Sequence, residues 1–262
     1  MSSITNNSPF VNTLMIWKAL FLKDALARFF GSRGAWAWLL IEPVAHILGM
    51  AFIYALIKKG TMGGVAMQPW IMTGMLAFFL FRRTAVQVLH SIDCNKAFFA
   101  FRQVRPFDAA ICKAGVEAFS MFWVAIIIAI AFMFAGFELV PDNILKVLVA
   151  LLGLWLLGLG YGLISSVMMR LVPDSGFILQ IIMMPLMIIS GIILPISSIP
   201  EPYRQYLLFN PLLHGIEEVR LGFWHSYHTV DTSLSYLYIW VLVLLVIGFA
   251  LYRALETRLV TQ

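Results

Sequence analysis

The sequence has little charge and almost no cysteine. Of its 262 residues, 12% are charged and 61% are hydrophobic, whereas soluble domains carry about 25% charged residues. Its two cysteines, Cys94 and Cys112, form neither a CxxC motif nor a Cys/His ligand pattern, so we expect reduced thiols and no metal site. The polar first twelve residues lack the basic n-region of a secretory signal peptide. Together these features predict an integral membrane protein.

Motifs of common catalytic and nucleotide-binding sites are also missing. The sequence contains no GxxxxGK[ST] phosphate loop, no HExxH and no GxSxG. Asp93, Asp108 and Glu117 are too scattered along the chain for the acid–base or metal set of a membrane-bound glycosyl or acyl transferase. We therefore expect a chain that is not an enzyme and has no cofactor of its own. Its net charge of +5 predicts basic residues gathered at one membrane face and does not indicate nucleic-acid binding.

Six apolar stretches approach the roughly 20 residues that a helix needs to span a membrane. If the N-terminus is cytosolic, four Lys or Arg precede the first span, four follow the second, one follows the fourth and two follow the last. These eleven, against five on the other face, favour two cytosolic termini, because basic residues concentrate on the cytosolic side. The predicted spans are Trp36–Ile57, Pro69–Leu89, Val116–Phe137, Leu145–Met169, Gly176–Ile193 and Ser233–Leu251.

Several charged residues lie before or inside these spans. Residues 1–35 mix apolar and basic side chains, which suits a helix at the inner membrane interface, although a cytosolic extension docked on the protein is the alternative. Arg82 and Arg83 lie inside the second span, where a charge costs about 2.5–3.5 kcal/mol near the bilayer centre. They either face a wet cavity or a partner chain, or extend to the headgroups. Glu42 and His46 are interpreted as a local polar pair, four residues apart.

Two irregular segments interrupt the pattern of spans. The longest cytosolic connection contains Phe98–Asp108, which predicts a short amphipathic helix ended by Pro106; it is either a docking element for another protein or an interfacial helix. After the fifth span, two apolar pieces, Pro200–Phe209 and Leu212–Phe223, are too short to cross the membrane. We expect them to form a re-entrant hairpin at the extracytoplasmic face, with an ordinary surface loop as the alternative.

Four sequence blocks carry a resemblance to a known family. They are FGSRGAWAWLLIEPVAHIL (30–48), FFAFRQVRPFDAAICKA (98–114), ISGIILPISSIPEPYRQYLLFNPLLHGIEEVR (189–220) and ALYRALE (250–256). The whole chain resembles the membrane subunit of type-2 ABC exporters, and among them the inner-membrane permease of capsular polysaccharide export. The resemblance implies an all-α integral membrane protein with six transmembrane helices in residues 36–262. An interface helix would lie in residues 1–35, a cytosolic coupling helix at about 94–110 and a periplasmic re-entrant pair at about 195–225.

The resemblance also implies partners and a function. The chain would form a homodimer in the bacterial inner membrane and bind two ATP-binding cassette subunits, which would bind ATP and Mg²⁺. Such exporters move a lipid-linked polysaccharide out of the cytosol and pass it to periplasmic co-polymerase-like and outer-membrane export proteins. Export of O-antigen or teichoic acid by the same architecture stays an alternative. A secondary transporter is less favoured, because the sequence shows no internal repeat.

Finally, the resemblance suggests roles for three groups of residues. Coupling to the ATP-binding subunit falls on Phe101, Arg102, Gln103, Val104, Arg105, Pro106, Phe107 and Asp108. Candidate glycolipid or polysaccharide contacts are Lys18, Lys23, Arg28, Arg33, Arg82, Arg83, Trp36, Trp38 and Tyr203. A periplasmic gate would use Pro195, Pro200, Tyr203, Asn210, Pro211, Glu217, Glu218 and Arg220. Further aromatic candidates for sugar stacking, for which packing against lipid is the ordinary alternative, are Trp17, Trp70, Phe78, Phe79, Phe81 and Tyr161.

Overall fold

The computed structural model describes residues 9–31, 35–57, 61–62, 64–100, 104–229 and 231–261. These residues are mostly helical, as predicted, with one two-stranded antiparallel hairpin. The elements are α1 (Pro9–Phe30), α2 (Ala35–Ile57), β1 (Thr61–Met62), β2 (Val65–Ala66), α3 (Met67–Leu89), α4 (Ser91–Cys94), the 3-10 helix η1 (Lys96–Ala100), α5 (Pro106–Phe134), α6 (Ile144–Leu171), α7 (Ser175–Ile181), α8 (Met183–Ile189), the 3-10 helix η2 (Ile196–Ser198), α9 (Tyr203–Leu207), α10 (Pro211–Phe223) and α11 (Leu234–Thr261).

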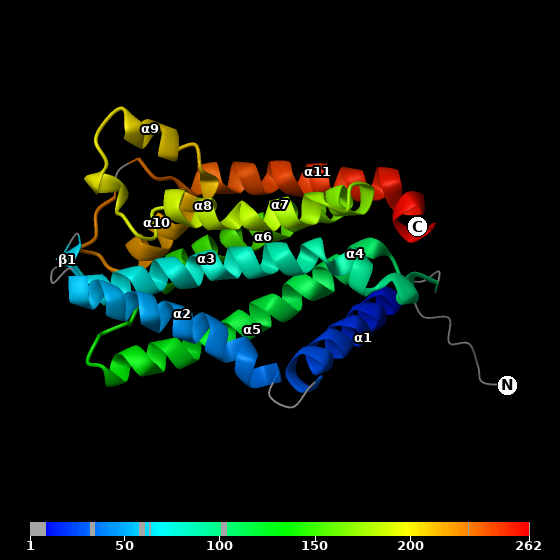
Figure 1. Cartoon of the computed structure of the whole chain (residues 1–262), viewed down its shortest axis with the longest axis horizontal. Helices are drawn as coiled ribbons and strands as arrows, with labels where there is room; N and C mark the ends of the chain where they lie inside the picture. Colours follow the sequence, from blue (N-terminus) through cyan, green and yellow to red (C-terminus); the bar gives the residue numbers. More distant parts are fainter. Residues whose placement is uncertain are drawn as a thin grey trace.

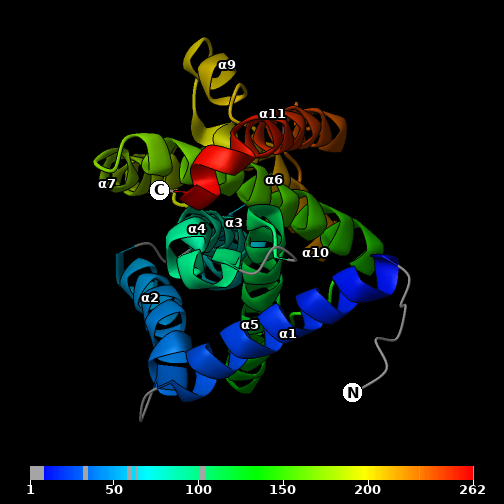
Figure 2. The same cartoon turned by 90° about the vertical axis from the view of Figure 1, so that its right-hand side faces the viewer.

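The long helices run back and forth along one axis of the molecule (Figure 1). One end of the bundle carries α1, α4 and the C-terminus, and the opposite end carries the β-hairpin, α9 and α10. Seen along this axis, α1 crosses obliquely beside α5 (Figure 2). Helix α3 packs against α2, α5, α6 and α10, so its side chains occupy the centre of the fold.

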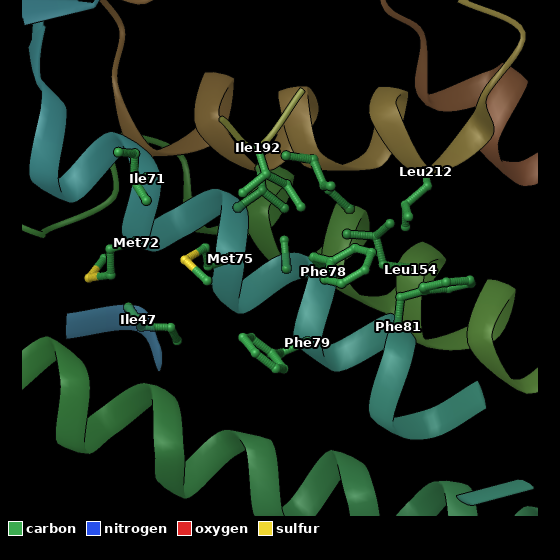
Figure 3. Close-up of a cluster of buried hydrophobic side chains, with 14 of the residues drawn as sticks. Ile47, Ile71, Met72, Met75, Phe78, Phe79, Phe81, Leu154, Ile192 and Leu212 are labelled. Atoms are coloured by element: carbon green, nitrogen blue, oxygen red, sulfur yellow. The ribbon is translucent and has the colours of Figure 1, made fainter. Parts of the chain in front are cut away.

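The core of the bundle is apolar and is centred on α3. Phe78, Phe79 and Phe81 of this helix are buried among side chains of the neighbouring helices (Figure 3). Leu154 of α6 and Leu212 of α10 belong to the same cluster. Aromatic side chains of this size bury about 150–250 Å² each. The core position of these three phenylalanines therefore does not support their predicted contact with sugar rings.

Four of the described helices are long and apolar enough to cross a membrane, namely α3, α5, α6 and α11 over Leu234–Glu256. Helix α2 and the pair α7–α8 occupy the first and fifth predicted spans; within the residues whose side chains are described, their apolar segments are Pro43–Ile53 and Ser175–Ile189. Residue Ile182 separates α7 from α8. The integral membrane fold is thus supported by four helices, and the count of six spans stays a prediction.

The helix of the third span begins earlier than the sequence pattern predicts. Pro106 is the first residue of α5, so the prediction of a short helix ended by Pro106 was wrong. Proline is favoured at the first helical position, because the N–H that it lacks has no partner inside the helix there. Asp108 stabilises this helix start by accepting a hydrogen bond from the Arg105 backbone N–H, at 3.0 Å. The connection therefore consists of α4, η1 and a segment that leads directly into α5.

The broken stretch after α8 forms two unequal helices. Helix α10 starts at Pro211, and the Asn210 side chain accepts a hydrogen bond from the Leu212 N–H at 3.1 Å. All its residues from Leu212 to Arg220 are buried, because it packs against α3, α6 and α11. Helix α9 is five residues long and stands off from the bundle (Figure 1). The placement of the two helices as a re-entrant pair in the outer leaflet stays a prediction.

Candidate functional site: a basic junction and a buried arginine lock

Helix α1 lies along the first turns of α5 and runs in the same direction. Trp17 Nε1 donates a hydrogen bond to Asp108 Oδ1 at 2.7 Å, and Lys113 Nζ lies 3.7 Å from Asp24 Oδ1. A third pair joins Arg28 to Glu117. The partners of these pairs are 91, 89 and 89 positions apart in the sequence. A nearly constant separation is expected of two helices that lie side by side and run in the same direction.

The carboxylate of Glu117 lies at the centre of this contact and is fully buried. Its Oε1 pairs with the guanidinium of Arg28 from α1. Its Oε2 accepts a hydrogen bond from Arg83 Nε of α3, at 3.2 Å. A charge without water needs such partners, because its desolvation otherwise costs several kcal/mol. Glu117 therefore ties three helices together, and Arg83 is explained by an internal ion pair.

Further charged residues of α1 and α5 lie near Glu117. Lys23 Nζ lies 3.0 Å from Asp24 Oδ1 and so joins the same group. A cavity of about 230 Å³ opens here, lined by Asp24, Arg28 and Lys113 together with Ala27 and Val116. The ion pairs of this group join Lys23 and Lys113 to Asp24, and Arg28 and Arg83 to Glu117. We call this group the basic junction; its members are Lys23, Asp24, Arg28, Arg83, Lys113 and Glu117.

A second buried charge group lies at the opposite end of the bundle, on α10. Arg220 Nη1 donates to Glu217 Oε1 at 2.7 Å and to the carbonyl oxygen of Gly191 at 2.8 Å. Its guanidinium lies 3.5 Å from the centroid of the Trp70 ring, within the range of a cation–π interaction. Tyr227 Oη donates to Glu217 Oε2 at 2.7 Å. We call these five residues the arginine lock.

The arginine lock holds the non-helical segment that follows α8 in place. The carbonyl oxygens of Gly191 and Ile192 come after the last helical residue, and both accept hydrogen bonds from Arg220, at 2.8 and 3.4 Å. Burial raises the pKa of the Tyr227 hydroxyl well above its usual range, and the Glu217 carboxylate raises it further. Tyr227 therefore stays protonated and keeps donating to Glu217 across the physiological pH range.

Sequence comparison decides the family. The ABC-2 type transporter family matches residues 17–224. The chain belongs to this family. It is 34% identical to the polysialic acid transport protein KpsM of Escherichia coli, over 94% of this chain and 95% of that protein. It is 25% identical to the capsule polysaccharide export inner-membrane protein CtrC of Neisseria meningitidis serogroup A, over 94% of each chain. Identity to the capsule polysaccharide export inner-membrane protein BexB of Haemophilus influenzae is 22%, over 90% and 89%. The resemblance stated from the sequence is confirmed.

In this ABC-2 transporter chain, some of the predicted lipid or sugar contacts come together. Lys23, Arg28 and Arg83 belong to the basic junction, while Lys18 is exposed on α1. The guanidinium of Arg82 lies 5.8 Å from the Phe79 ring centroid. Tyr203, another predicted contact, lies at the opposite end of the bundle on α9. Arg33 lies outside the described residues, and the side chains of Trp36, Trp38 and Glu42 are not described.

The predicted coupling residues flank the start of α5. Phe101, Arg102 and Gln103 lie outside the described residues, and Arg105 is exposed. Phe107 packs its ring against α11, with centroid distances of 5.5 Å to Phe249 and 6.3 Å to Tyr252. This contact, together with the Trp17–Asp108 hydrogen bond, connects the predicted docking segment of the ABC-2 chain to both of its terminal helices.

The predicted gate residues divide into buried and exposed groups. Glu217 and Arg220 have no exposed surface and form the centre of the arginine lock. Glu218 pairs with Lys146 of α6 at 3.1 Å. Asn210 caps α10 and also donates to Ser190 Oγ at 2.9 Å. Pro195 is buried, Pro211 begins α10, and Pro200 and Tyr203 are exposed. Their role in a gate stays a prediction.

Glu117 is the functional candidate that sequence reasoning missed. It was considered only as one of three scattered acidic residues in a search for an enzyme site. The available signal was a lone carboxylate near the start of one apolar span, with two arginines inside another, because charges in membrane segments usually pair. Trp70 is the converse case: it was a candidate for stacking on sugars, but it is fully buried under Arg220.

Proposed function

We propose that this chain is the transmembrane subunit of an ATP-driven exporter that moves lipid-linked capsular polysaccharide across the bacterial inner membrane. The observation that carries the proposal is the match to KpsM, CtrC and BexB over 89–95% of both chains. The names of these relatives describe polysialic acid transport or capsule polysaccharide export. Because the matches extend over nearly the whole chain, they support the same task and not only a shared domain.

The proposed complex contains two copies of this chain and two separate ATP-binding subunits. A separate subunit is needed because this sequence has no phosphate loop of its own. Both termini would lie in the cytosol. The distribution of the described Lys and Arg supports this orientation: Lys146, Arg204 and Arg220 lie toward the α10 end, whereas Lys18, Lys23, Arg28, Lys96, Arg105, Lys113, Arg170, Arg253 and Arg258 lie toward the α1 end.

Coupling to the ATP-binding subunits would act through the segment between α4 and α5. Movement of Arg105 is transmitted directly to α5, because Pro106 is the first residue of that helix. Asp108 then carries α1 along through its hydrogen bond with Trp17. The two helices would move as one rigid body, and the basic junction would move with them. The periplasmic co-polymerase-like and outer-membrane proteins would receive the polymer at the α9–α10 end.

Deleting the gene and restoring it tests the proposed function. We expect the deletion strain to accumulate capsular polysaccharide in the cytosol and to lose it from the surface, both measured by immunoassay on intact and permeabilised cells. The reintroduced gene restores surface polysaccharide. Loss of O-antigen or teichoic acid with an intact capsule would instead support the alternative substrate. Co-purification of the chain with the expected ATP-binding subunit tests the assembly.

The variant Arg105→Glu tests the coupling assignment. We expect it to abolish surface polysaccharide, because it reverses the charge beside the predicted docking segment, while the chain still inserts and dimerises. Arg258→Glu is the matched control, since Arg258 is an exposed basic residue at the same end of the bundle, on α11. Membrane levels by immunoblot and dimerisation by cross-linking accompany the export assay. Wild-type export by Arg105→Glu would remove the coupling role.

A further inference from the structure

We propose that His214 is a pH-sensitive clasp, which joins the end of α9 to the start of α11 and releases it when the imidazole is protonated. His214 lies on the first turn of α10, at the end of the bundle where the polymer would leave in the proposed function. The clasp rests on the proposed orientation of the chain only for the direction from which the proton arrives, which is the side away from the cytosol.

Both ring nitrogens of His214 hold backbone groups of other segments. The N–H of Ser233, immediately before α11, donates to Nδ1 at 3.0 Å. Nε2 lies 2.8 Å from the carbonyl oxygen of Leu208, the residue that follows α9. Because a backbone N–H only donates and a carbonyl oxygen only accepts, Nδ1 carries no proton and Nε2 carries one. The imidazole in this arrangement is therefore neutral.

Protonation of His214 removes the acceptor that the Ser233 N–H needs. An imidazolium carries an N–H on both nitrogens, so two donors would then face each other. His214 is only 4% exposed, and a buried donor without an acceptor costs about 1–3 kcal/mol. The ring must turn or withdraw, and at least one of its two bonds is lost. Histidine is the side chain that changes charge between about pH 5 and 8, so mild acid is sufficient.

The charges around His214 allow the imidazolium to form. Helix α10 packs against α3, α6 and α11, and α3 has no titratable side chain before Arg82. Glu218, one turn after His214 on α10, and the exposed Asp231 before α11 both favour a cation here, whereas Lys146 of α6 opposes it. The ion pairs on the surrounding elements are Lys146–Glu218, Arg220–Glu217 and Arg204–Glu201.

Release of His214 would loosen α9 from the bundle. Helix α9 has no buried residue and stands off from the other helices (Figure 1). Besides His214, the described side chains that hold the chain after α9 include Tyr236, whose Oη donates to the Phe209 carbonyl oxygen at 3.0 Å, and Asn210, which donates to Ser190 Oγ at 2.9 Å. The rings of Tyr236 and His214 are stacked, with centroids 4.6 Å apart. Displacing one ring therefore disturbs the other, and two of these ties weaken together.

Hydrogen exchange of the purified full chain in detergent tests the clasp. Exchange is followed by mass spectrometry at about pH 7.5 and 5.5, with exposure times scaled to the intrinsic exchange rate at each pH, because local opening controls the remaining difference. We expect peptides that contain residues 203–209 and 232–237 of the wild type to exchange about tenfold faster at the lower pH, the effect of one lost hydrogen bond.

His214→Gln separates a switch from a merely structural histidine. The glutamine amide can accept from Ser233 and donate to Leu208, but it does not titrate, so both peptides should exchange slowly at both pH values. The matched control His228→Gln changes an exposed histidine at the same end and should keep the wild-type difference. Ser233→Pro removes the N–H that conflicts with the added proton, and proline is tolerated at a helix start, so this variant should also reduce the difference.

Three results would overturn the proposal. The first is a wild type whose two peptides exchange equally at both pH values. The second is a His214→Gln variant that keeps the pH dependence, which would assign it to a carboxylate such as Asp231. The third applies if His214→Gln does not fold, and is an unchanged difference in Ser233→Pro. Each measurement uses the purified chain alone, so none depends on whether deletion of the gene abolishes capsule export.

Discussion

Replacing Arg220 by leucine is the most direct perturbation of the end of the bundle that holds α10. In the wild type, the buried guanidinium donates to Glu217 and to the carbonyl oxygens of Gly191, Ile192 and Trp70. The variant removes all of these donors at once and leaves the Glu217 carboxylate buried. We therefore expect a large loss of stability, because the charge that remains has no cation beside it.

The magnitude can be worked from the burial of the pair. Removing one partner of a buried ion pair costs about 3–5 kcal/mol, and each buried carbonyl left without a donor adds about 1–3 kcal/mol. Since these contributions overlap, we expect Arg220→Leu to lower the free energy of unfolding by about 4–6 kcal/mol. Glu217→Gln should cost less, because Arg220 keeps three carbonyl acceptors and the Trp70 ring. The double replacement by leucine should cost less than the sum of the single changes.

The chain contains a matched control for this experiment. Arg204 and Glu201 form an ion pair with the same spacing of three residues, at 2.6 Å, but on the exposed helix α9 and its preceding turn. Arg204→Leu should change the free energy of unfolding by about 0–1 kcal/mol, the usual range for surface pairs. Stability is measured by denaturant unfolding in lipid micelles and monitored by tryptophan fluorescence, to which Trp70 contributes directly.

Three outcomes would refute the reasoning about the arginine lock. An Arg220→Leu variant within about 0.5 kcal/mol of the wild type, the size of an ordinary surface substitution, would show that Arg220 does not hold α10 in place. An equal effect of Arg204→Leu would show that burial is not the cause. Strict additivity of the two leucine replacements would show that Glu217 and Arg220 do not interact.

Two further predictions concern packing and pH. Gly74→Ala places a methyl group against the guanidinium of Arg220, so we expect overpacking to lower the free energy of unfolding by about 1–3 kcal/mol. The control is Gly49→Ala, at a helical position where no described atom lies within 4 Å of the added methyl group. This variant should be neutral or stabilising in the same unfolding assay. Burial lowers the pKa of His90 below its ordinary value of 6.5. Below pH 6.5 the unfolded chain therefore binds a proton at His90 more readily than the folded chain does. The free energy of unfolding should fall as the pH drops below 6.5. His90→Gln should remove this part of the pH dependence between about pH 7.5 and 5.5 in thermal unfolding, and an unchanged slope would contradict the assignment.

The sequence alone was sufficient for the class and much of the helical framework. Apolar runs with few charges specify membrane helices, because the bilayer offers no partner for backbone N–H and C=O groups. Within the part of the chain that the structure describes, four of the six predicted spans correspond to helices that meet the criteria of length and hydropathy. The family was also recognisable from four blocks of residues, and the match to residues 17–224 confirmed it.

Local patterns failed where the role of a residue depends on its neighbours in the folded chain. Proline is found both after the ends of helices and at their first position. Pro106 was therefore predicted to end a helix, whereas it begins α5. The re-entrant placement of α10 rested on its length and stays a prediction, whereas the burial of this helix against α3, α6 and α11 could not be predicted from length. Length cannot distinguish a helix that dips into lipid from one that is enclosed by other helices.

The sequence by itself therefore determined that this protein is a helical membrane protein, and it marked the charges that needed explanation. Only the tertiary structure decided which charges meet. Glu117 pairs with Arg28 and Arg83, which are 89 and 34 positions away, and Arg220 stacks on Trp70 across 150 positions. Periodicity within one helix carries no information about such distant partners, because they are selected by the packing of whole helices and by the cost of leaving a buried charge alone.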